Sequence, residues 1–360
     1  MKPFIVMDIV KKSRELNDVI HLEIGEPDLL PSPKVKEALI NAANENKFFY
    51  TQTKGLLALR EKIATHYKNT YNVEINPENI IITTGTSTAF LIAFYFANIV
   101  ATPTPGYPCY ENFAELENKN FLKIPTSYPD FQLNVDSLKN LNFDTLMISS
   151  PNNPTGTVIE NENLKEICEY CKKNDKLLIS DELYHGLVYT KNYTTALKYN
   201  KNAIIISGFS KYFCMPGFRI GWIILPDNLI RKAEIIAQNI LISAPTLSQY
   251  AALEAFDYKY LEKVKNEFKK RRDYLYEELK EIFPIAKPQG AFYLWCDISE
   301  YSNDSMDFCN KLLKNAKVAA TPGIDFGDFK NYIRIAYTKN IEELQIATGR
   351  IKNFIYSKKY

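Results

Sequence analysis

The chain has 360 residues, of which 46% are hydrophobic and 24% charged, and its formal net charge is +2. This composition is typical of a globular protein long enough for two domains, and the balanced charge argues against nucleic acid or an anionic membrane as partners. The six cysteines and three histidines show no spacing typical of a disulfide framework or a metal site. We therefore expect a cytoplasmic protein without a metal.

The N-terminal part of the chain predicts one short strand and two helices. Residues 19–24 are mostly apolar and end in the Gly/Pro-containing turn 25–28. Helical patterns follow over 33–45 and 57–69. Between these helices lie three consecutive aromatic residues that end at Tyr50, and packing against the second helix is the simplest expectation for that tyrosine.

A junction that could bind an anion follows the next strand. An apolar strand over 79–84 leads into Gly85, Thr86 and Ser87, and an apolar helix is predicted over 88–100. Free backbone N–H groups and the helix dipole can hold a phosphate at such a junction. The same residues could equally cap the helix, and this segment alone favours neither interpretation.

Two further apolar strands lead into polar side chains. One covers 143–149 and precedes a loop that contains Asn153, and the other covers 176–181 and ends at Asp181. A buried aspartate needs a cationic partner or hydrogen bonds. Capping of a following helix is the alternative for Asp181.

A lysine and an arginine follow the next buried strand. The β-branched run at 204–206 leads into a turn of small residues at Lys211, and Arg219 lies eight residues further along. A lysine at the dry end of a sheet can lose its charge by desolvation and act as a nucleophile, and an arginine offers a bidentate donor for a phosphate. Solvated surface positions are the alternative for both residues.

The C-terminal third predicts two helices and a strand with a further arginine. The helices cover 228–240 and 246–282, and the second is long enough to connect a large domain to a smaller one. Arg334 lies within a strand over 332–336, where an edge position in water is the simplest expectation. Four apolar strands lead into Gly85, Asn153, Asp181 and Lys211, so we expect these side chains to gather at one edge of one α/β sheet.

Three motifs resemble those of the class I/II aminotransferases, the fold-type-I enzymes that carry pyridoxal phosphate (PLP) on a lysine. They are Ser-Gly-Phe-Ser-Lys with Gly-Phe-Arg-Ile-Gly around Lys211, Ser-Pro-Asn-Asn-Pro-Thr-Gly at 150–156, and Pro-Gly-Tyr-Pro-Cys-Tyr at 105–110. The resemblance extends from about Leu22 to Ala336. It implies a large PLP-binding domain over 39–262 with a mostly parallel sheet, and a small α/β domain formed by 1–38 and 263–360.

The resemblance also implies roles for individual residues. Lys211, Asp181 and Tyr184 would be catalytic, with Lys211 joined to PLP as a Schiff base, and Gly25, Asn153 and Arg334 would bind the substrate. The cofactor would be bound by Gly85, Thr86, Ser87, Tyr107, Asn153, Asp181, Tyr184, Ser207, Ser210, Lys211 and Arg219. Tyr50 would reach the cofactor phosphate of the partner subunit in a homodimer with shared active sites. Within these roles, Tyr107 would stack on the pyridine ring and Asp181 would pair with its nitrogen.

One departure from the family pattern concerns the phosphate. Residue 208 is a glycine where many relatives have a phosphate-binding serine. We expect Ser207 and Ser210 to compensate for the missing hydroxyl.

Transfer of an amino group between an L-amino acid and a 2-oxo acid is the expected reaction. Two alternatives share the same residues: β-elimination from a sulfur-containing amino acid, and binding of PLP or an amino acid without turnover. The side chain of the substrate is not predicted, because no second arginine can be assigned to a second carboxylate.

Overall fold

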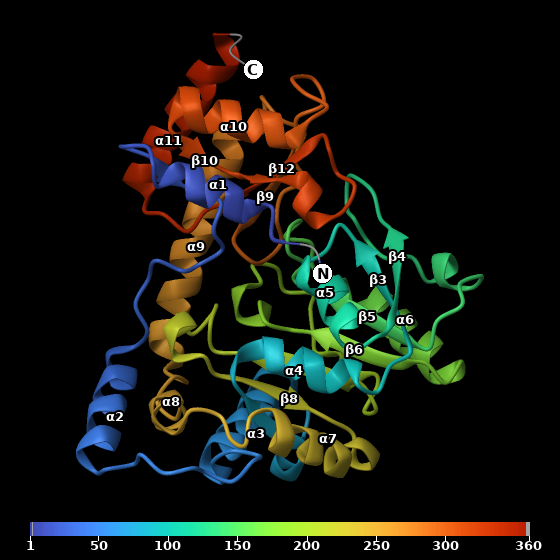
Figure 1. The fold of residues 1–360 in the computed structure, drawn as a ribbon. Coiled ribbons are helices and arrows are strands. Elements are labelled where there is room, and N and C mark those ends of the chain that lie inside the picture. The colour runs from blue at the N-terminus through green and yellow to red at the C-terminus, as the bar shows by residue number, and fades with distance from the viewer. Residues whose placement is uncertain (2, 358–360) are drawn as a thin grey trace.

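The computed structural model describes residue 1 and residues 3–357. The chain forms a large unit around a seven-stranded sheet and a smaller unit, and the helix α9 (Tyr258–Leu279) runs from one to the other (Figure 1). None of the helices in this part of the chain is long and apolar enough to cross a membrane. The α/β fold class predicted from the sequence is confirmed.

The large sheet is mostly parallel. Its strands are β2 (Ile80–Thr83), β3 (Ile99–Thr104), β4 (Asn120–Pro125), β5 (Thr145–Ser149), β6 (Leu177–Asp181), β7 (Ile204–Gly208) and β8 (Gly221–Ile224). They lie in the order β2-β8-β7-β6-β5-β3-β4, and β8 runs in the direction opposite to the other six strands. Strands β2, β5, β6 and β7 therefore all end at the same edge.

Helices cover both faces of this sheet. One face packs against α4 (Gly85–Phe94), α5 (Cys109–Leu116) and α7 (Asp227–Ile240). The other packs against α2 (Pro33–Asn44), α3 (Leu57–Tyr71), α6 (Asn161–Lys173) and α8 (Thr246–Ala252). In β7, Ile204 and Ile206 face the first group and Ile205 the second. Because successive side chains of a strand point to opposite sides, an unbroken apolar run makes both faces of the sheet apolar.

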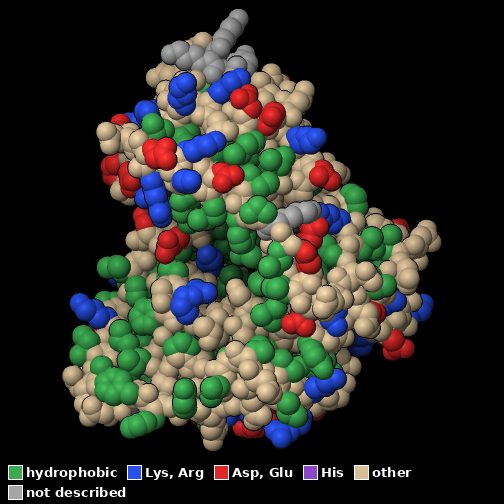
Figure 2. All heavy atoms as spheres, viewed as in Figure 1, with side chains coloured by type: hydrophobic (Ala, Val, Ile, Leu, Met, Phe, Trp, Pro, Cys, Tyr) green, Lys and Arg blue, Asp and Glu red, His purple; other side chains and the backbone are tan. Residues whose placement is uncertain are grey.

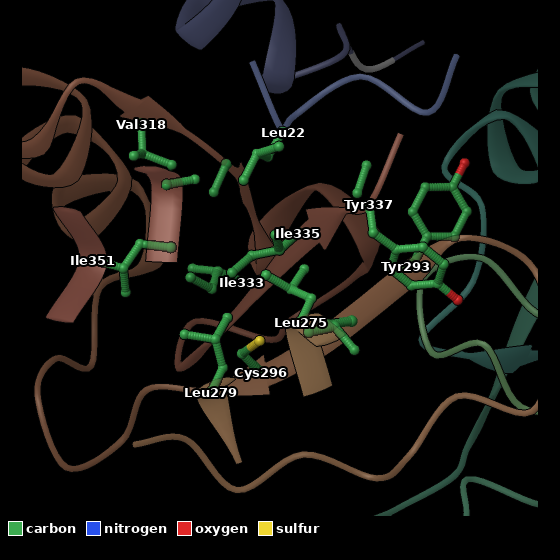
Figure 3. Close-up of a cluster of buried hydrophobic side chains, with 14 of the residues drawn as sticks. Leu22, Leu275, Leu279, Tyr293, Cys296, Val318, Ile333, Ile335, Tyr337 and Ile351 are labelled. Atoms are coloured by element: carbon green, nitrogen blue, oxygen red, sulfur yellow. The ribbon is translucent and has the colours of Figure 1, made fainter. Parts of the chain in front are cut away.

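The small unit combines segments from both ends of the chain. Its elements besides α9 are α1 (Val6–Ser13), β1 (Ile20–His21), β9 (Tyr293–Asp297), α10 (Ser305–Ala316), β10 (Val318–Ala319), β11 (Thr321–Pro322), β12 (Tyr332–Ala336) and α11 (Ile341–Tyr356). A short 3₁₀ helix of the same unit covers Gly323–Phe326, and others in the rest of the described chain cover Pro77–Asn79, Val135–Leu138, His185–Leu187, Ala196–Lys198 and Pro216–Phe218. Figure 3 shows Leu22, Ile333 and Ile335 in the core of this unit. Arg334 therefore lies on the opposite face of β12.

Two helix predictions are wrong in their extent. The helix predicted over 88–100 ends at Phe94, and Ile99 begins β3, because an apolar run does not by itself distinguish a buried helix from a buried strand. The helix predicted over 246–282 is divided into α8 and α9. The side chain of Asp257 accepts a hydrogen bond from the Tyr260 N–H and caps the second helix.

Candidate active site

A cavity of about 360 Å³ lies between the two units, at the edge where β5, β6 and β7 end. Figure 2 shows the surface hollowed at this boundary, with Lys or Arg side chains and hydrophobic side chains inside the hollow. Predicted site residues from both units line it: Gly25, Thr86, Ser87, Tyr107, Asn153, Asp181, Tyr184, Ser210, Lys211, Arg219 and Arg334. The structure therefore brings most of the predicted residues together.

Lys211 presents to this cavity an amine whose pKa is lowered. It follows β7 and its Nζ donates a hydrogen bond to the main-chain oxygen of Gly25 at 2.6 Å. Burial, together with the cationic side chains of Arg334 and Arg219, lowers the pKa of the Lys211 amine to about 8. At pH 7 about a tenth of the amine is therefore uncharged and able to act as a nucleophile or base.

Asp181 is a buried carboxylate at the end of β6 and is only 5% exposed. Its Oδ2 accepts a hydrogen bond from the Tyr110 hydroxyl at 2.6 Å, and its Oδ1 accepts one from the Leu183 N–H at 3.0 Å. Burial raises the pKa of Asp181 to about 6, although these two donors oppose the rise. Within the described residues it forms no ion pair, so a ligand cation would complete its surroundings.

A cradle for an anion forms where β2 passes into α4. Gly85 has a φ of +68°, and a Cβ added there would lie 2.7 Å from Nη2 of Arg219, so the arginine can approach only a glycine. Arg219 is held by a hydrogen bond from its Nη1 to the Pro216 oxygen at 3.0 Å. Thr86 and Ser87 lie in the first turn of α4, where the free N–H groups and the nearby guanidinium could donate to the same anion. This geometry suits a phosphate.

The two serines expected to replace the missing hydroxyl at position 208 differ in their placement. Ser210 lines the cavity. The Ser207 hydroxyl instead donates to the main-chain oxygen of Glu182 at 3.2 Å, and Ser207 lines a separate, smaller cavity. Compensation by Ser207 thus lacks a geometric basis, and Ser210 is the serine within reach of an anion in the main cavity.

Arg334 forms a rigid donor group on the small-unit side. Its Nη1 donates to Oδ1 of Asn153 at 2.9 Å, while Nη2 donates to the Glu23 main-chain oxygen at 2.5 Å and to Oγ1 of Thr321 at 3.1 Å. The guanidinium lies 4.4 Å from the ring centre of Tyr293, and its Nε has no partner among the described residues. The buried Nε could donate to a carboxylate, and the amide nitrogen of Asn153 could donate to a ligand.

Tyr184 and Gly25 are both fixed by Tyr293. The hydroxyls of Tyr184 and Tyr293 lie 2.6 Å apart, and burial raises the pKa of Tyr184 well above its ordinary value. A Cβ added at Gly25 would overlap the Tyr293 hydroxyl. Glycine is therefore required here for close packing.

Tyr50 does not reach the cavity of its own chain. Its side chain is 80% exposed, next to Phe48 and Phe49, which are also exposed. The Phe49 main-chain oxygen accepts a hydrogen bond from Oγ1 of Thr246 at 2.7 Å, which ties this segment to α8. Any contact of Tyr50 with a cofactor would have to be made in another subunit.

Sequence reasoning missed several residues that complete the cavity. Tyr110 and Tyr293 position Asp181 and Tyr184, and Glu23 also lines the cavity. Tyr110 was within a motif already recognised, so its position beside Tyr107 was a usable signal. Tyr293 begins β9 and Glu23 lies in the segment after β1, and only the tertiary packing sets which of their neighbours face the cavity.

Comparisons with known proteins identify the family of the chain. Residues 17–351 match the family model described as aminotransferase class I and II. A (5-formylfuran-3-yl)methyl phosphate transaminase of Methanocaldococcus jannaschii is 40% identical over 98% of this chain and 96% of its own. A valine–pyruvate aminotransferase of Mycobacterium tuberculosis is 34% identical over 99% and 97%.

The solved structures point to the same family. The crystal structure of an aminotransferase from Mycobacterium tuberculosis superimposes with a TM-score of 0.96 at 33% identity, covering 99% of this chain and 97% of that one. The lysine, carboxylate and anion cradle described above thus lie on a scaffold shared with enzymes that transfer amino groups. The chain belongs to the class I and II aminotransferases and is itself an aminotransferase.

Proposed function

We propose that this aminotransferase uses pyridoxal 5'-phosphate, bound in the cavity between the two units. The observation that carries the proposal is the buried carboxylate of Asp181, which forms no ion pair within the described residues and shares the cavity with the amine of Lys211. A protonated pyridine nitrogen would supply the missing cation. The cradle at Gly85 and Arg219 suits the phosphate, so the residues present fit this group at both of its ends.

In this proposal each side chain has a defined task. Lys211 would carry the cofactor covalently and, once its amine is free, accept the proton from Cα of the substrate. Arg334 would bind the α-carboxylate and so orient the Cα–H bond toward that amine. Asn153 and Tyr184 would donate to the ring oxygen. When bound, PLP supplies the electron sink that makes the Cα proton removable.

The proposed substrates are an L-amino acid and a 2-oxo acid. By their names, the relatives described above act on different substrates, one on valine and pyruvate and another on (5-formylfuran-3-yl)methyl phosphate. Their diversity does not identify the side chain that this enzyme prefers. The names of these relatives support amino transfer over β-elimination or binding without turnover.

We further propose a homodimer with shared active sites. Exposed apolar side chains lie on α2, α3, α7 and the intervening segments: Leu30, Ile40, Phe48, Phe49, Tyr50, Leu57, Ile240 and Ile242. Figure 2 shows hydrophobic side chains over the region of α2 and α8 in Figure 1. An exposed apolar group of this extent is typical of an interface, and the membership of Tyr50 in it supports a contact with the partner's cavity.

The domain division is proposed from the packing. Leu261 packs with the large sheet and Val264 with the small unit, which supports the boundary at 262/263. Val35 also packs with the large sheet, so we place the start of the large domain at Pro33 rather than at residue 39. Six free, buried cysteines support a reducing compartment such as the cytoplasm.

A two-part assay tests the reaction. The purified protein, reconstituted with PLP, is mixed with single amino acids, and conversion of the cofactor to its amino form is followed by absorbance. A 2-oxo acid is then added, and reversal of the spectrum is expected. Release of pyruvate and ammonia from cysteine-type substrates, without amino transfer, would establish the lyase instead. A cofactor spectrum that no donor changes would favour a binding protein.

A further inference from the structure

Glu23 lines the cavity and its side chain is fully buried, but the chemistry above gives that side chain no role. Its Oε1 lies 2.8 Å from Nδ1 of His21, and within the described chain its Oε2 has no hydrogen-bond partner. A buried carboxylate oxygen without a donor destabilises the fold unless something supplies one. In a residue that lines a binding cavity, a ligand group is the simplest donor.

The position of Glu23 beside Arg334 indicates which part of a substrate it would meet. Nη2 of Arg334 donates to the Glu23 main-chain oxygen at 2.5 Å, so the two residues are adjacent. Nε of Arg334 and Oε2 of Glu23 both lack partners, which means that the two side chains do not satisfy each other. A substrate whose α-carboxylate binds Arg334 would therefore lie close to Glu23, within reach of a donor on the substrate's side chain.

The other groups at this end of the cavity are mostly apolar. They come from the N-terminal segment, the turn after β1 and the loop before β12: Phe4, Val6, Met7, Ile24 and Phe326. Asp325 also lines the cavity, but its carboxylate accepts hydrogen bonds from the Ile5 and Val6 N–H groups at 2.9 and 3.4 Å. An apolar wall that holds one carboxylate with an unpartnered oxygen favours a ligand with an apolar stem and one hydrogen-bond donor. A ligand with a second carboxylate would meet like charge at Glu23.

We propose that Glu23 selects amino acids whose side chain carries a hydroxyl or an amine at the end of an apolar stem. This inference rests on the proposed function, because it assumes that Arg334 binds the α-carboxylate. Glu23 is a specificity-determining residue in this account and takes no part in proton transfer.

Binding of unreactive acids tests the inference without turnover. The PLP-loaded enzyme is titrated calorimetrically with hydrocinnamate and its para-hydroxy derivative, and with pentanoate and its terminal amino derivative. Each pair differs in a single donor group, so the two pairs distinguish a hydroxyl from an amine. In at least one pair, we expect the member that carries the donor to bind at least about 10-fold more tightly than the other member.

Three variants assign that preference to Glu23. Glu23→Met removes the acceptor at similar size and should abolish the preference. Glu23→Gln keeps the shape but removes the charge, and it should bind glutarate about 10-fold more tightly than the wild type does. Glu26→Gln alters an exposed glutamate of the same turn that does not line the cavity, and it should keep the wild-type preference.

The outcomes separate this inference from the proposed function. Equal binding within both pairs by the wild type, or an unchanged preference in Glu23→Met, overturns the role of Glu23 and leaves amino transfer intact. Should Glu23→Met fail to fold, an unchanged glutarate affinity in Glu23→Gln overturns it equally. If none of the acids binds and no amino acid is converted, the proposed function itself fails.

Discussion

Nζ of Lys211 and the main-chain oxygen of Gly25 lie 2.6 Å apart, so the two units of the chain meet at the reactive nitrogen. Lys211 follows the large sheet, whereas Gly25 follows β1 of the small unit. A movement of the small unit relative to the large sheet would therefore change the hydrogen bonding of the amine directly. This contact links the arrangement of the units to the chemistry of the site.

Covalent attachment of PLP to protein stripped of cofactor should accelerate as the pH rises to about 8 and then level off. Burial lowers the pKa of the Lys211 amine from 10.5, so below pH 8 the uncharged amine becomes the minor form and falls about tenfold per pH unit. Stopped-flow absorbance across the pH range measures this rate. A midpoint near 10.5, the value of an exposed lysine, would contradict the buried amine.

Asp181→Ala should lower amino transfer by about 100-fold or more, because the buried charge that stabilises the ring cation is lost. The milder change Tyr110→Phe removes a donor to the Asp181 carboxylate and should raise its pKa by about one unit or more. As the solution is acidified, activity that requires the ionised Asp181 is therefore lost at a higher pH in Tyr110→Phe than in the wild type.

The pH profile of kcat/KM measures this shift of the acid limb. Tyr128→Phe, at a half-exposed tyrosine that does not line the cavity, is the matched control and should leave the limb in place. An acid limb that stays at the wild-type pH in Tyr110→Phe would show that the tyrosine does not control the Asp181 carboxylate.

Ser210→Ala should loosen the cofactor, whereas Ser207→Ala should not. Loss of one hydrogen bond to a charged phosphate costs about 1.5–3 kcal/mol, which raises the dissociation constant of PLP by about 10- to 150-fold. Ser207→Ala instead loses a bond to the Glu182 oxygen and should cost about 1 kcal/mol of folding stability. Equilibrium dialysis and thermal unfolding separate the two effects, and equal loosening in both variants would be the contrary result.

Mixed dimers test whether the active sites are shared. Lys211→Ala and Tyr50→Ala homodimers should each be nearly inactive. After subunit exchange at equal amounts, about a quarter of wild-type activity should return, because half of the dimers are hybrids and each has one intact site. A fully active monomer, shown by light scattering during the assay, would exclude this arrangement.

The fold and most of the site could be predicted because local patterns carry them. β-branched runs such as 204–206 indicate strands buried on both faces, and the polar residue after each run marks the shared edge. The run 89–100 misled the prediction because its apolar residues fit a helix and a strand alike. Its end, from Ile99, forms a strand because it pairs with β5 and β4, and a local pattern does not show that pairing.

The contacts across the cavity could not be predicted in this way. The bond from Lys211 to Gly25 joins residues 186 positions apart, and the bond from Arg334 to Asn153 joins residues 181 apart. Such contacts depend on how the small unit packs onto the large one, which no local pattern specifies. Ser207 shows the same limit, since its rotation toward Glu182 follows from the alternation of β7 in the sheet.

The central claim, that Lys211 carries the cofactor, has a direct chemical test. Borohydride reduction of the PLP-loaded protein fixes the cofactor on its amine, and peptide mapping by mass spectrometry locates the pyridoxyl group. The account predicts the label on Lys211 in the peptide that follows β7, with none on that peptide in Lys211→Ala. A stoichiometric label on any other lysine of the wild-type chain would contradict it.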